Sequence, residues 1–187
     1  MFTSTSLIDD ILKLNVTNAS LVDASVIVYS KGFRSLCEQN KCGSYNKNWM
    51  CPPAVGPIED LMAEAGRYRH ALVFQTVHSI AKSFDFKGMF EAAAKHENVV
   101  RSVLKHIIGK YGIKDVIPLG VGPCHFCKEC THIDGEECRF PDKAIASLEA
   151  YGIDVAKLLK ICGIPYHNGK NTVSYVGCML FEDCMAP

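Results

Sequence analysis

Residues 122–141 read GPCHFCKECTHIDGEECRFP, and their four cysteines fall within fifteen residues. Cys124, Cys127, Cys130 and Cys138 have the spacing C-x2-C-x2-C-x7-C. A C-x2-C-x2-C run lets the chain turn around the corners of an iron–sulfur cube, so that successive thiolates reach successive irons. This stretch therefore predicts a [4Fe-4S] cluster held by the four cysteines.

Zinc is the alternative occupant of this segment. Structural zinc sites also take four thiolates, but their ligands usually arrive as two C-x2-C pairs separated by a longer spacer. His125 and His132 lie in the same segment. Because the thiolates already suffice as ligands, we expect both imidazoles to be solvated. A zinc-stabilised binding module without redox function stays open beside the iron–sulfur interpretation.

A second group of cysteines lies upstream, where residues 37–53 read CEQNKCGSYNKNWMCPP. Cys37, Cys42 and Cys51 are spaced x4 and x8, among turn-forming residues that predict an irregular loop. The proline after Cys51 resembles the Cys-Pro that closes ferredoxin ligand runs, where it turns the chain away from the metal. We expect a metal here as well, with Trp49 either covering it or packing elsewhere as an ordinary aromatic.

The composition is that of an ordinary globular protein. A chain of 187 residues can form one domain with its own core, and we expect a single metal-binding domain over residues 1–187. Lys plus Arg and Asp plus Glu number 20 each, so no overall field would attract nucleic acid or an anionic membrane. The sequence shows no signal peptide and no membrane span. The ten cysteines therefore indicate a reducing cytoplasm and metal ligation rather than disulfides.

Hydrophobic periodicity predicts an alternation of strands and helices. β-Branched and aromatic runs predict strands at residues 24–31, 70–78, 113–121 and 172–181. Apolar residues at helical spacing predict helices at residues 5–14, 57–68, 86–110, 141–151 and 154–162.

The helix at residues 86–110 is the longest of these elements. We expect His96 and His106 on its solvated side, since neither has a spacing that pairs it with a ligand. Its expected core face consists of Phe90, Ala93, Ala94, Val99, Val103, Leu104 and Ile107.

Single residues carry further expectations. Pro118 inside the strand at 113–121 predicts an edge strand or a bulge, because proline cannot donate to a ladder. Cys162 and Cys178 occupy apolar positions and are expected to be core thiols, whereas Cys184 lies near the end of the sequence.

The order of elements predicts an α+β sandwich. Its core would be a ferredoxin-like split βαβ arrangement with an inserted long helix and two cysteine-rich metal loops. A mixed α/β sheet layered by helices is the alternative. If the strands at 24–31 and 113–121 were parallel neighbours, their carboxyl ends would share one edge of the sheet. We therefore expect Cys51 and Cys124 to lie close together.

With both cysteine segments considered, the chain resembles a family of predicted metal-binding proteins. That family is catalogued as a domain of unknown function and occurs in anaerobic bacteria and archaea. The matching residues are 42–53, 122–141 and 147–155, and the resemblance covers roughly residues 25–181. It supplies no reaction. It implies metal binding through Cys37, Cys42, Cys51, Cys124, Cys127, Cys130 and Cys138.

Seven thiolates fall one short of the eight that would hold two four-iron clusters entirely through cysteine. In one arrangement, the four downstream cysteines hold a closed cube, and Cys37, Cys42 and Cys51 hold a second metal with an open position. In the other, Cys138 joins the upstream three, as in two-cluster ferredoxins, and the remaining three cysteines take another ligand.

Three classes of function follow. The first is an electron carrier with one or two [4Fe-4S] clusters and a redox partner protein. The second is an enzyme that uses the open metal position, with nearby acids and imidazoles moving protons. The third is the zinc-stabilised binding module. The candidates for proton transfer, which are otherwise a solvated loop rim, are Glu129, Glu137, His125 and His132.

Overall fold

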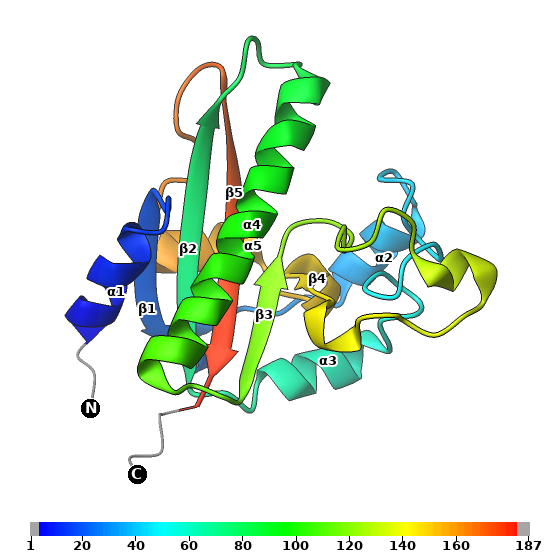
Figure 1. Ribbon diagram of the computed structural model, residues 1–187, viewed down its shortest axis with the longest axis horizontal. Helices are drawn as coiled ribbons and strands as arrows, with labels where there is room; N and C mark the ends of the chain where they lie inside the picture. Colours follow the sequence, from blue (N-terminus) through cyan, green and yellow to red (C-terminus); the bar gives the residue numbers. More distant parts are fainter. Residues whose placement is uncertain (1–3, 183–187) are drawn as a thin grey trace.

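The computed structural model describes residues 4–182, and a five-stranded sheet forms its centre (Figure 1). The sheet order is β1-β2-β5-β3-β4, with β3 and β4 parallel and every other neighbouring pair antiparallel. The strands are β1 (Asn18–Asp23), β2 (His70–Ser79), β3 (Val116–Gly120), β4 (Ala146–Ser147) and β5 (Thr172–Phe181).

Helices cover both faces of the sheet. The α1 and α4 side chains form one core with Leu72, Phe74 and Met179, and α3 and α5 contribute to a second core with Val73 and Cys178. None of the helices described is both long and apolar enough to cross a membrane. The helices are α1 (Ser4–Leu12), α2 (Gly32–Glu38), α3 (Ile58–Ala65), α4 (Phe86–Tyr111) and α5 (Val155–Ile161).

The mixed α+β class is confirmed, but the ferredoxin-like split βαβ core is not. The central pair is β2 and β5, which lie antiparallel over ten residues from His70–Phe181 to Ser79–Thr172. Both strands were predicted at these positions. Gly177 lies opposite Phe74, and a side chain there would collide with the phenylalanine ring, so glycine permits this close strand pairing.

The predicted strand at residues 24–31 is wrong. The strand in this region is β1, which ends at Asp23, where the Asp23 carboxylate accepts a 2.9 Å hydrogen bond from the Ser25 amide. This cap begins a 3₁₀ turn at Ala24–Val26, so the chain leaves the sheet. Further along, Tyr29 forms an isolated antiparallel bridge with Ile153. The segment before the upstream cysteines therefore packs against the turn at 149–153 rather than beside β3.

The expectation of an edge strand or a bulge at Pro118 is wrong, because β3 lies between β5 and β4 and its register with β5 is unbroken. β3 pairs with β5 from Val116 to Leu119, but β4 joins its other side only at Leu119 and Gly120. Pro118 therefore has no described strand beside it on that second side, although β3 is not the outermost strand of the sheet. A residue without an amide hydrogen fits such a position.

The long helix α4 is confirmed, but its core face is rotated from the expected one. Phe90, expected in the core, is 73% exposed. His96, expected in solvent, is completely buried, with Nδ1 2.8 Å from Thr76 Oγ1. His106 is partly buried, with Nε2 3.7 Å from Asp10 Oδ2. The buried residues are Ala92, His96, Val100, Val103 and Ile107.

The predicted helix at 141–151 is wrong. A 3₁₀ turn at Pro141–Lys143, strand β4 and a second turn at Glu149–Tyr151 take its place, because Ala146 and Ser147 pair with β3. The following helix is confirmed as α5, where the Asp154 carboxylate accepts a 3.0 Å hydrogen bond from the Lys157 amide.

The two cysteines predicted to be core thiols lie in the same core. Cys178 is completely buried, which confirms that it is a core thiol. Cys162 is partly buried and packs against the edge of this core. Cys184 lies outside the described residues.

Candidate metal centre

The two cysteine-rich segments, residues 37–53 and 122–141, lie side by side (Figure 1). Three side chains join them. The Asn48 amide donates to the Cys124 carbonyl at 2.9 Å, and the Trp49 indole donates to the Glu136 carbonyl at 3.1 Å. His132 Nε2 lies 3.2 Å from the side-chain oxygen of Asn46. The expected proximity is thus confirmed, although it does not arise from two parallel strands.

The upstream segment begins on a helix that the sequence analysis missed. Cys37 lies in the last turn of α2, a helix without a fully buried side chain, so it carries little hydrophobic periodicity. The Arg34 guanidinium donates to the Gly56 carbonyl at 2.9 Å. The backbone amide of Asn46 donates to the Pro52 carbonyl at 2.8 Å. These bonds fold the upstream segment back on itself, so that Cys51 lies near the beginning of the segment.

The downstream segment closes through Thr131, which is buried. Its hydroxyl donates to the Glu137 carbonyl at 2.8 Å, and its carbonyl accepts from the Glu136 amide at 3.1 Å. A short 3₁₀ turn, Thr131–Asp134, occupies the space between. The seven residues between Cys130 and Cys138 thus form a closed turn that returns the last cysteine to the first three.

The four downstream cysteines line one small cavity with largely apolar walls. The Trp49 and His132 rings are in edge contact at 4.7 Å between centroids, and Phe126 and Phe140 are in edge contact at 5.1 Å. Trp49 therefore lies over the downstream cysteines and not in the core of the sheet. The lining residues of this cavity are Asn48, Trp49, Met50, Cys124, Phe126, Cys127, Cys130, Thr131, Cys138, Phe140 and Ala144.

The upstream cysteines lie next to this cavity. Burial raises the pKa of the Cys51 thiol to about 12, and the neighbouring thiols of both segments add to the increase. Burial also raises the pKa of Cys37; Arg34 opposes that shift, and Cys42 and the Glu149 carboxylate add to it. Cys51 is thus an upstream cysteine that interacts with thiols of both groups, and Cys37 interacts with the Glu149 carboxylate.

The donor set has the chemistry that iron–sulfur clusters and zinc use. The nine cysteines described are free thiols, and no carboxylate lines the downstream cavity. Thiolate ligands select soft or borderline metals. Within residues 4–182, no three His, Cys, Asp or Glu side chains converge closely enough to surround a single ion. The role of all seven cysteines as ligands stays a prediction.

The other polar candidates of the two segments differ in position. His125, Glu129 and Glu137 are exposed, as expected of a solvated rim. His132 is partly buried and packs against Trp49, so it is less solvated than expected.

Asn48 and Glu149, which the sequence analysis missed, also belong to this region. Asn48 lies in an asparagine-rich turn sequence, where its spacing gives no signal of a role. Glu149 lies in a segment that was predicted as helix, and only the observed turn brings it toward Cys37.

Comparison with protein families finds one match. Residues 20–181 match the family described as "Predicted metal-binding protein (DUF2284)". No curated protein and no solved structure matches the chain.

Proposed function

Because the chain belongs to this family of predicted metal-binding proteins, we propose that it binds a [4Fe-4S] cluster and transfers electrons. The observation that carries the proposal is the shared cavity of Cys124, Cys127, Cys130 and Cys138. Four thiols on one short segment match the ligand chemistry of such a cluster. When bound, the cluster supplies one-electron redox chemistry.

The surrounding side chains have defined roles in this proposal. Trp49, Phe126 and Phe140 limit the access of water to the cysteines, which affects the reduction potential of a cluster. Arg101 and Lys143 lie over the Phe126 ring at 4.7 and 5.3 Å and place positive charge at the rim. A redox partner protein would approach at this rim.

The shared cavity favours one of the two ligand arrangements. Cys138 lines the same space as the three cysteines of the C-x2-C-x2-C run, which supports a closed set of four. Cys37, Cys42 and Cys51 would then hold a second metal with one open position. That open position is the basis of a second candidate function, an enzyme, which the nearby Glu149 favours.

Analysis of the anaerobically purified protein tests the proposal. We expect iron and sulfide in stoichiometric amounts, with a broad absorption at about 400 nm. Cys127→Ala removes one proposed ligand, and we expect it to lose sulfide and absorption. Cys162→Ala removes a thiol of the sheet core and should retain both. Stoichiometric zinc in a colourless protein would reject the cluster and support the zinc-stabilised module.

A further inference from the structure

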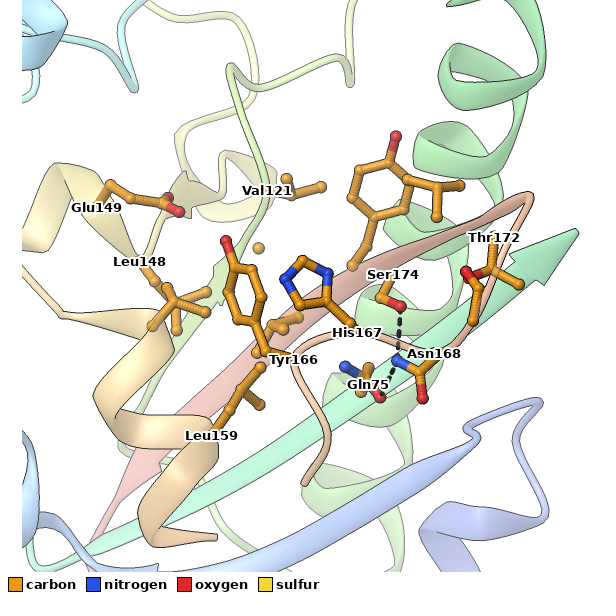
Figure 2. Close-up of a pocket in the computed structure, with 16 residues that line it drawn as sticks. Gln75, Val121, Leu148, Glu149, Leu159, Tyr166, His167, Asn168, Thr172 and Ser174 are labelled. Atoms are coloured by element: carbon orange, nitrogen blue, oxygen red, sulfur yellow. Dashed lines mark hydrogen bonds between the residues drawn. The ribbon is translucent and has the colours of Figure 1, made fainter. Parts of the chain in front are cut away.

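A larger cavity of about 290 Å³ lies between the sheet, α5 and residues 166–169 (Figure 2). Leu159 of α5 and Val176 of β5 supply apolar wall, and both side chains belong to the core on this face of the sheet. Gly120 and Val121 complete the wall at the end of β3. The walls of the cavity therefore come from packed secondary structure, as those of small-molecule sites commonly do.

The floor of the cavity is a connected set of polar side chains. Gln75 is completely buried, and its amide donates to the Pro165 carbonyl at 2.9 Å. Its oxygen accepts from Asn18 at 2.9 Å and from Asn168 at 3.3 Å. Asn168 also donates to the Ser174 hydroxyl at 2.8 Å, as Figure 2 shows. These bonds hold the floor in place without a ligand.

The cavity is lined by one carboxylate, Glu149, and by one basic side chain, His167. Glu149 is the one acidic residue among its lining residues, and no lysine or arginine lines it. In Figure 2 the Glu149 carboxylate points into the cavity. Burial raises the pKa of this carboxyl, with hydrogen bonds from its own backbone and from Ser147 opposing the shift. A partly desolvated carboxylate is stabilised by a cation that approaches it.

Tyr166 supplies a second group suited to a cation. Its side chain projects into the same space as Glu149 in Figure 2 and remains 57% exposed. The His167 ring lies at 84° to the tyrosine ring, with 5.1 Å between centroids, and supports it from one side. The hydroxyl oxygen can accept a hydrogen bond, and the ring face attracts positive charge.

We propose that this cavity binds a small organic amine. Its ammonium group would lie between Glu149 and Tyr166, and its aliphatic part would contact Leu159 and Val176. An anionic ligand such as a phosphate or carboxylate is disfavoured, because the cavity presents a carboxylate and no lysine or arginine.

The cavity adjoins the candidate metal centre through two residues. Val121 lines its wall, three positions before Cys124, and Glu149 lies within electrostatic range of Cys37. A bound amine would therefore lie on the side of the cavity that faces the candidate metal centre. This placement next to a metal rests on the proposed function, whereas binding to the cavity itself does not.

Binding of n-butylamine to the anaerobically isolated protein tests the inference, with n-butanol and butyrate as neutral and anionic probes of similar length. Saturation-transfer NMR and calorimetry would measure the binding, and iron and sulfide would be assayed on the same preparation. We expect n-butylamine to bind and butyrate not to bind. Glu149→Gln should weaken amine binding roughly tenfold or more, since a charge-assisted hydrogen bond is lost. Tyr166→Ala should weaken it roughly threefold.

Glu91→Gln on α4 is the matched control, because it removes an exposed carboxylate from the opposite face of the sheet, and it should leave binding unchanged. Equal affinity in Glu149→Gln, preference for butyrate, or no amine binding to a folded protein would overturn the inference. Amine binding by a protein that holds zinc supports the cavity and rejects the cluster. A cluster-loaded protein that binds none of the probes rejects the cavity and leaves the proposed function intact.

Discussion

The Asn48 side-chain amide donates a hydrogen bond to the Cys124 carbonyl at 2.9 Å, across 76 positions of sequence. Asn48 is only 7% exposed, and its side-chain oxygen accepts from the Met50 amide at 3.0 Å. The same side chain thus shapes the upstream segment and holds the first cysteine of the downstream segment. The two candidate ligand groups therefore form one structural unit.

Substitution of Asn48 should loosen this unit. In Asn48→Ala the Cys124 carbonyl loses its donor, and we expect a loss of about 1–3 kcal/mol in the free energy of unfolding. Release of metal to a chelator should also be faster. Thermal unfolding and the rate of metal release measure the two effects. Asn98→Ala, at an exposed position of α4, serves as the control, and identical behaviour of the two variants would refute the linking role.

Trp49 should report on the metal centre directly. It is the only tryptophan of the chain and lines the cavity of the four downstream cysteines. We expect bound cluster to quench its fluorescence, and chelation to restore the emission. In Cys127→Ala the emission should be high from the start. Fluorescence that does not change when iron and sulfide are lost would place the cluster away from this cavity.

The strands of the sheet centre could be predicted almost to the residue, because residues 70–79 and 172–181 are apolar segments rich in β-branched and aromatic side chains. The pairing of these two strands with each other could not be predicted, since no local pattern encodes which strand supplies the hydrogen-bond partner. The two-residue strand β4 shows the same limit. Ala146 and Ser147 become a strand only through β3, whereas their neighbours alone suggested a helix.

The candidate site divides in a similar way. The four downstream thiols could be named as ligand candidates from their spacing, because a cluster takes ligands at short, repeated intervals. The three upstream thiols were named from their turn-rich loop and from the family resemblance. The sequence could not identify Asn48, Glu149 and Asn168 in the same way. Each of them interacts with residues that are distant in the sequence. His96 was placed on the wrong side of its helix because the Thr76 hydroxyl that accompanies it into the core lies on β2.

Metal removal should open both cysteine segments without unfolding the sheet. Residues 37–53 and 122–141 contain few buried side chains, so metal–thiolate bonds at the proposed ligands would contribute strongly to their order. After chelation we expect faster amide exchange and protease cleavage in both segments. Amides of β2 and β5, at the centre of the sheet, should stay protected and provide the internal control. Equal protection of the segments with and without metal would contradict this coupling.

Acid should destabilise the protein through His96. Burial lowers the pKa of this imidazole to about 4, compared with 6.5 for a solvated histidine. Between these values the unfolded chain binds the extra proton and the folded chain does not. Stability is therefore complete above about pH 6.5 and falls as the pH decreases toward 4, by up to about 3 kcal/mol.

His96→Gln removes the titrating group of this prediction while keeping a polar side chain near Thr76. Urea unfolding of metal-free protein, followed by far-UV circular dichroism from pH 7 to 4, measures the effect without the protonation of metal-bound thiolates. We expect a shallower decline of stability for this variant than for the wild type. His167→Gln, at an exposed histidine, should retain the wild-type decline. Parallel curves for His96→Gln and the wild type would show that acid acts on other groups.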